Sequence, residues 1–173
     1  WEVKATNEAG GFGLQTDGAI RCGIRVRGRT LILTTTDAHV ALYSGPPLVY
    51  GFQQAGKNCG VVSDRAVAAT GAGAFWMGRD GFYTYDGSAV RELPCEVSDR
   101  VFRFMDKSNW QNIFAVANAK FNEITWFYAD STSEGVEVAI GDQTFIRKVN
   151  NRYVTYDYAQ NIWSIGSINR HAG

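Results

Sequence analysis

The sequence is poor in residues that interrupt strands or crosslink them. It contains only three prolines, and its three cysteines, Cys22, Cys59 and Cys95, are an odd number without the spacing of a zinc site or a disulfide framework. Small or apolar residues flank each cysteine, so we expect free, buried thiols. Seventeen basic and seventeen acidic residues cancel, so no overall charge draws the chain to nucleic acid or to a membrane surface.

Long apolar runs are also missing. Every uncharged run is far shorter than the roughly 20 residues that a membrane-spanning helix requires, and no basic-then-apolar leader opens the sequence. We therefore expect no membrane span. The sequence begins at Trp1 without an initiator methionine, so we expect residues 1–173 to be a single β domain that is a fragment of a larger chain.

What the sequence does contain is glycine and aromatic residues. Nineteen glycines punctuate short runs of β-branched and aromatic residues, which predicts a mainly β fold. One short helix is expected near residues 98–107, with Ser98 as the cap and Val101, Phe102 and Met105 on one face. The predicted strands are 19–27, 29–36, 39–44, 48–53, 65–70, 73–77, 82–85, 89–93, 113–118, 123–128, 152–158 and 162–168.

The predicted strands recur as a pattern of an apolar run, a turn, a second run, a turn and a third run. The copies are "RTLILTTTDAHVALYSGPPLVYGF", "AFWMGRDGFYTYDGSAVREL" and "NEITWFYAD" continued by "NRYVTYDYAQNIWSIGSI". Leu31, Phe75 and Thr125 align at steps of roughly 40 to 50 residues, the spacing of propeller blades. We predict a β-propeller-like module of about three antiparallel blades. Since a closed propeller has at least about four, the missing blades would come from this polypeptide or from another subunit.

The third copy is interrupted by residues 131–151. This insertion contains "GVEVAI" and "TFIRKV" on either side of Gly141-Asp142, which favours a projecting hairpin. Val136, Val138 and Ile140 alternate with Glu137 and Ala139, so one face could be buried. An insertion in a repeat fold usually emerges on one face, where partners dock. The alternative is a disordered loop.

Four arginines form the most informative charge pattern. They occupy alternate positions in "IRCGIRVRGR", and the residues between them are mostly apolar, so a strand here would have a basic face. Guanidinium groups about 7 Å apart suit a phosphate backbone or a carboxylate-rich partner subunit. A solvated face that protects an edge strand is the alternative. The candidate DNA or subunit contacts are Arg21, Arg25, Arg27 and Arg29.

The aromatic run "FWMGRDGFYTYDG" has two interpretations. Its rings could fill the space between neighbouring sheets, which the repetition of the pattern favours. Alternatively, Tyr83 and Tyr85 could form an aromatic surface for a sugar, because alternate residues of a strand share a face.

Signals for catalysis are few. Cys59 and His39 lack the sequence context of a nucleophile and its base, and no cluster of histidine, cysteine and carboxylate has metal-ligand spacing. Asp80, Asp86, Asp130 and Asp157 follow aromatic runs or lie in turns, where aspartate bonds to its local backbone. We therefore predict no enzymatic activity, no metal and no cofactor.

The order of segments across residues 25–170 resembles the C-terminal part of short-tailed bacteriophage tail proteins. "RGRTLILTTTDAHVALYSGPPLVYGFQQAGKNCGVVS", "FWMGRDGFYTYDG", "LPCEVSDRVF", "AKFNEITWFYAD" and "NRYVTYDYAQNIWSIGSI" carry this resemblance. The chain is similar to the packaged-DNA stabilisation proteins of P22-like phages and the tail nozzle proteins of T7-like phages. The insertion at residues 131–151 departs from the usual passage between "WFY" and "RYV".

The resemblance implies a structural role without catalytic residues. Such a protein would be a subunit of a ring, commonly sixfold, in the virion tail or neck, where it helps to retain and conduct packaged DNA. It would be made in the bacterial host cytoplasm, and its partners would be further tail or neck subunits and, non-specifically, DNA. The alternative is a stand-alone propeller-like domain that binds a glycan or a protein, and a hydrolase on a propeller is a third hypothesis.

Overall fold

The computed structural model describes residues 11–45 and 49–168, which form a mainly β fold of four antiparallel sheets. The predicted fold class is confirmed at this level. Three sheets have four strands each, and the fourth is a two-stranded hairpin. The first sheet consists of β1 (Ile20–Val26), β2 (Arg29–Thr34), β3 (Ala38–Tyr43) and β4 (Tyr50–Gly56).

The second and third sheets repeat this meander. The second sheet consists of β5 (Val67–Thr70), β6 (Gly73–Met77), β7 (Phe82–Tyr85) and β8 (Val90–Leu93). The third sheet consists of β9 (Phe114–Asn118), β10 (Glu123–Tyr128), β13 (Arg152–Asp157) and β14 (Ile162–Ser167). The repeat pattern in the sequence captured the last three strands of each sheet, and the strand before each copy completes it.

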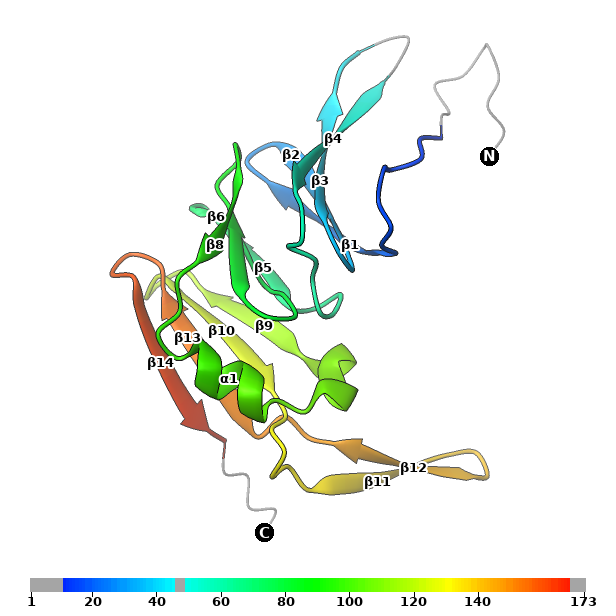
Figure 1. The fold of residues 1–173 in the computed structure, drawn as a ribbon, viewed down its shortest axis with the longest axis vertical. Helices are drawn as coiled ribbons and strands as arrows, with labels where there is room; N and C mark the ends of the chain where they lie inside the picture. The colour runs from blue at the N-terminus through cyan, green and yellow to red at the C-terminus, as the bar shows by residue number, and fades with distance from the viewer. Residues whose placement is uncertain (1–10, 46–48, 169–173) are drawn as a thin grey trace.

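The three sheets lie side by side in chain order (Figure 1). The first strands of successive sheets are neighbours, with β1 beside β5 and β6, and β5 beside β9. The aligned residues Leu31, Phe75 and Thr125 fall on β2, β6 and β10, the second strand of each sheet. Within the described residues, the sheets do not close into a ring.

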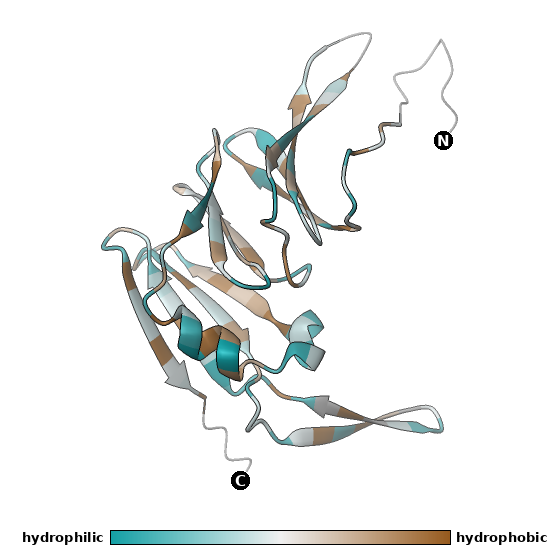
Figure 2. Ribbon diagram, viewed as in Figure 1, coloured by the Kyte–Doolittle hydropathy of each residue, from teal (hydrophilic) through white to brown (hydrophobic). Residues whose placement is uncertain are grey.

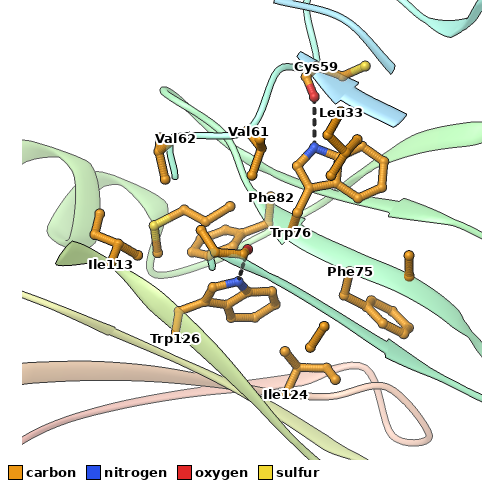
Figure 3. Packing of buried hydrophobic residues seen from close by; sticks show 14 of the residues in the cluster. Leu33, Cys59, Val61, Val62, Phe75, Trp76, Phe82, Ile113, Ile124 and Trp126 are labelled. Carbon is orange, nitrogen blue, oxygen red and sulfur yellow. Dashed lines mark hydrogen bonds between the residues drawn. The ribbon is translucent and has the colours of Figure 1, made fainter. Parts of the chain in front are cut away.

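In the core between the first and second sheets, the side chains that the first sheet contributes are mainly aliphatic. Strand register places Leu31 and Val40 on the face of the first sheet that packs against the second sheet, and both are buried. The second sheet contributes the rings of Trp76 and Tyr85, both almost fully buried. The indole nitrogen of Trp76 donates a 2.7 Å hydrogen bond to the carbonyl oxygen of Cys59 (Figure 3).

The core between the second and third sheets has aromatic residues on both sides. The Phe82 ring of the second sheet lies 4.9 Å from the Trp126 ring, centroid to centroid (Figure 3). It lies 4.7 Å from the Trp163 ring. Tyr156 stacks on Trp163 at 4.5 Å. The indole nitrogen of Trp126 donates to the Ala66 carbonyl oxygen over 3.0 Å, which satisfies a polar atom that burial would otherwise leave unpaired.

Two short helices connect the second and third sheets, α1 (Ser98–Phe104) and the 3-10 helix η1 (Lys107–Asn112). The predicted helical face is confirmed for Val101, which is buried, and for Phe102, which packs on the Phe82 ring at 5.3 Å. The predicted end at residue 107 is wrong, because Met105 is buried but is the extended C-cap and lies outside the helix. The predicted cap is wrong. Val97 is the N-cap and no side chain bonds there, so Ser98 already belongs to the helix.

The insertion is a hairpin of β11 (Gly135–Ile140) and β12 (Gln143–Lys148), as predicted. Gly141 turns the chain with a φ of 62°, which glycine adopts without steric cost. The hairpin projects from the body of the protein (Figure 1), and Figure 2 shows apolar bands along it. The expected burial of one face is wrong for Val136, which is 51% exposed because no sheet packs over it; the side chain of Ile140 lies outside those described.

Candidate interaction surfaces

The four arginines do not alternate along one strand. Strand β1 ends at Val26, and Arg27 and Gly28 turn the chain with φ values of 47° and 80°. Two residues with positive φ form the tight turn that matches the twist of a hairpin. Arg29 therefore begins β2, and the prediction of a continuous basic strand is wrong at this point.

Arg27 and Arg29 contact the second sheet. The Nη2 atom of Arg27 donates to the Gly71 carbonyl oxygen over 3.2 Å, in the turn between β5 and β6. The Nη1 atom of Arg29 donates to the Gly87 carbonyl oxygen over 2.9 Å, in the turn between β7 and β8. These two arginines fasten neighbouring sheets to each other, so their donors are partly used within the chain.

Arg21 and Arg25 are exposed on β1. Arg25 lies opposite Thr30, Thr30 opposite Ala41, and Ala41 opposite Phe52, so the four form one row across the first sheet. Residues that face each other across strands share a side of the sheet, and this side is turned away from the second sheet. Arg21 lies at a bulge in the pairing of β1 with β2, between Ile20 and Cys22.

The side of the first sheet that carries Arg25 is rich in rings; we call it the first open face. Phe12 stacks on Phe52 with 5.1 Å between centroids, and Tyr43 meets Tyr50 edge-on at 5.8 Å. Tyr43 is 71% exposed and Tyr50 is 54% exposed. Exposed rings grouped in this way are typical of a contact surface.

The third sheet has a second open face, on the side away from the second sheet. Phe114, Phe127 and Tyr153 cross β9, β10 and β13 in a row, with centroid separations of 4.8 Å and 6.3 Å. The Tyr153 ring covers Gly166 of β14 so closely that any side chain there would collide with it. All three rings are half-buried.

A hollow of about 470 Å³ lies between this second open face and the base of the hairpin. Phe114 and Phe127 line it from the sheet, and Val136, Val138 and Val149 line it from the hairpin side. The sequence indicated the hairpin but not this hollow. Only the fold brings the start of β9 beside β11.

Tyr83 and Tyr85 do not form an exposed aromatic surface. They share a strand face, as expected, but that face packs against the first sheet, and Tyr85 is 1% exposed. Its hydroxyl donates to the Gly87 carbonyl oxygen over 2.9 Å. Tyr83 is half-buried, stacks on Trp76 and donates to the Asn58 carbonyl oxygen over 3.1 Å. The rings fill the space between sheets.

The cysteines are free thiols, and Cys59 is buried while Cys22 and Cys95 are half-buried. Burial, with a smaller effect of nearby Asp37, raises the pKa of the Cys59 thiol to about 11. A nucleophilic cysteine requires the opposite shift. His39 is buried on β3. Within residues 11–45 and 49–168, no group of three histidine, cysteine or carboxylate residues could hold a metal ion.

The predicted turn role of aspartate is confirmed at three positions. Asp86 accepts from the backbone nitrogens of Ser88 and Ala89, and Asp157 accepts from those of Ala159 and Gln160. Asp130 accepts from the backbone nitrogen and the hydroxyl of Thr132. These carboxylates fix local backbone rather than converge on one point.

Comparison with known proteins adds no family. No protein-family model matches the sequence, and no curated protein matches it significantly. The resemblance to phage tail proteins therefore stays a prediction. None of the helices in the described part of the chain has the length and apolar character needed to cross a membrane.

Proposed function

We propose that this chain is a non-enzymatic assembly module of a bacteriophage virion tail or neck, which helps to retain and conduct packaged DNA. The observation that carries the proposal is the pair of open faces at the two ends of the stack, the first with Phe52, Tyr43 and Tyr50, the second with Phe114 and Phe127. Rings on both terminal sheets over which no further sheet packs in the described residues are typical of a piece that needs a neighbour on each side.

The sheets are blades of a propeller-like module in this proposal. Each is a four-stranded meander, and their first strands lie side by side, as they do around the axis of a propeller. The two flanking positions belong to further blades of the same kind.

The neighbours in this proposal are other copies of this chain, arranged in a ring. The first open face of one copy would pack on the second open face of the next, a head-to-tail contact that generates a ring when the rotation closes. The chain would be made in the bacterial host cytoplasm and then incorporated into the virion tail.

DNA contact in this proposal falls to Arg21 and Arg25. They lie on β1, the edge strand at the opposite side of the first sheet from β4, so packing through the rings of β3 and β4 leaves this edge free. Both arginines are exposed, whereas Arg27 and Arg29 are tied to the second sheet. Each phosphate contact contributes roughly 0.9 to the slope of log affinity against log salt. Replacing Arg21 and Arg25 with alanine in the assembled protein should lower that slope by about two for duplex DNA. An unchanged slope would remove these arginines from the DNA contact.

The location of the chain tests the virion role. Antibodies raised against the chain should label the tail or neck of purified phage particles in electron micrographs, and genes for a portal protein and a terminase should lie nearby. Particles that contain no copy of the chain would contradict the proposal.

The second candidate function is a stand-alone domain that binds a glycan or a protein. The hollow at the base of the hairpin favours it, because its volume and apolar lining are typical of ligand sites. Glycan-array binding by the isolated chain that is lost in Phe114→Ser would favour this alternative over the virion role.

A further inference from the structure

A polar pocket of about 510 Å³ lies where helix α1 meets β10, β13 and β14. Tyr128, Arg152 and Ser167 lie directly opposite one another on the three strands, so their side chains share one face of the third sheet. Arg100 of α1 lines the pocket from the helix side. This face is the one turned toward the second sheet, so the pocket is separate from the second open face.

Arg152 is held in place by Asp130. Its Nε atom donates to Asp130 Oδ2 over 2.6 Å, and Asp130 is itself fixed by Thr132 and Asn151. Although burial opposes ionisation, these bonds keep the pKa of the Asp130 carboxyl below its usual value, so the pair stays charged at neutral pH. Among the described residues, the two Nη atoms of Arg152 have no acceptor, so the guanidinium is positioned with four N–H donors to spare.

Two further donors in the pocket, from Tyr128 and Arg100, are unpaired as well. Tyr128 is 4% exposed, yet its hydroxyl has no hydrogen-bond partner in the described part of the chain. Arg100 is exposed and has no acceptor there either. The Tyr128 hydroxyl is not among the buried polar atoms that lack a partner, so it reaches the space of the pocket, where it is free to donate to a ligand. Both Arg100 and Arg152 lie close enough to Tyr128 to lower its pKa, against the larger effect of burial that raises it.

We propose that this pocket binds a phosphate group between Arg100, Arg152 and Tyr128. Two guanidinium groups reach the pocket from different elements, and Asp130 neutralises one of their charges, so the pocket keeps a net positive charge. A carboxylate is planar, so the parallel donors of a single arginine side chain would be enough to bind it. A second arginine, the phenol and the Ser131 and Ser167 hydroxyls supply donors in several directions, as a tetrahedral oxyanion requires.

Calorimetric titration of the full chain distinguishes the sources of the phosphate. The two probes are inorganic phosphate and a dinucleotide with a single phosphodiester, each followed to about 10 mM at neutral pH because one small anion supports only weak binding. Binding of inorganic phosphate assigns the pocket to a free or terminal phosphate. Binding of the dinucleotide alone assigns it to a nucleic-acid backbone.

The variants locate the site. Arg100→Ala should weaken binding of the bound probe about tenfold or more, the effect of removing a charged hydrogen bond. Tyr128→Phe keeps the buried ring and should weaken binding several-fold. Arg103→Ala removes an arginine from the same helix, outside the pocket lining, and should leave affinity unchanged. If neither probe binds the wild-type chain, or if Arg100→Ala and Tyr128→Phe bind as the wild type does while circular dichroism shows them folded, the proposal is overturned.

Discussion

The two interfaces between the large sheets have the same backbone arrangement but different contents. Between the first and second sheets, aliphatic residues such as Leu31 and Leu33 face the rings of Trp76 and Tyr85. Between the second and third sheets, rings come from both sides, and Phe82 contacts Trp126 and Trp163. Within the described residues, ring pairs cross only the second of these interfaces.

This difference shows that the repeats share their strand pairing, whereas the side chains that pack between the sheets differ from one interface to the other. Offset and tilted ring pairs add attraction beyond the area they bury, so the second interface should be the harder one to separate. The first interface has arginine contacts instead. Arg27 and Arg29 reach across it to the turns of the second sheet. Substitutions at the two interfaces can therefore show which interface contributes more to the free energy of unfolding.

Trp126→Ala should have the largest effect on stability. The side chain is fully buried, contacts Phe82 and donates to Ala66, so its loss leaves a large cavity and removes one of the two hydrogen bonds that the Ala66 carbonyl oxygen accepts. We expect a loss of about 3 to 5 kcal/mol in the free energy of unfolding, measured by urea denaturation. A loss below about 2 kcal/mol would contradict the ranking.

Leu33→Ala should cost less. Leu33 is also fully buried, but its truncation removes a smaller side chain and no hydrogen bond. We expect a loss of about 2 to 3 kcal/mol in the same urea titration. Should Leu33→Ala destabilise the protein more than Trp126→Ala, the aromatic interface would not be the stronger one.

Asp130→Asn should loosen the end of the third sheet in a pH-dependent way. Because the folded-state pKa of Asp130 is lowered, its stabilising effect is fully present above the unfolded value of about 3.8 and is lost as the pH falls through the lower folded value. We expect the free energy of unfolding of the variant to be lower by about 2 kcal/mol at pH 7. It should also fall less steeply in acid than that of the wild type. Asp86→Asn is the control in an exposed turn, where solvent screening should make both changes smaller. Equal acid profiles for Asp130→Asn and the wild type would refute this role.

Arg29→Ala should have a small effect on stability, and Arg25→Ala should have none. Arg29 donates to Gly87 across the first interface, whereas Arg25 is exposed without such a contact in the described part of the chain. We expect the free energy of unfolding to fall by about 1 kcal/mol or less for Arg29→Ala, because its hydrogen bond is exposed. For Arg25→Ala we expect no measurable change. Equal thermal midpoints for the two variants would show that the arginine contact does not hold the sheets together.

Local patterns were enough to predict the strands and the inserted hairpin. Strands β6, β7 and β10 begin and end where the sequence predicts, because glycine and aspartate turns bound their β-branched and aromatic runs. The predicted strands break at Gly28, but the place of Arg27 in the same turn escaped prediction, since arginine seldom adopts a positive φ.

The sites depend on contacts between distant residues. Burial of Tyr85 follows from which side of the second sheet the first sheet covers. The phosphate pocket joins Arg100 of a helix to Tyr128 and Arg152 of two strands. Periodicity places each residue on its own element but says nothing about which elements meet.

Sedimentation velocity of the full chain over a range of concentrations tests the two open faces most directly. The wild-type chain should self-associate, and Tyr43→Ser with Phe127→Ser should sediment as a folded monomer because one ring is removed from each face. Thr155→Ser, which keeps a hydroxyl on the second open face, serves as the control and should assemble like the wild type. A wild-type chain that stays monomeric at every concentration, or variants that assemble as it does, would contradict an assembly module.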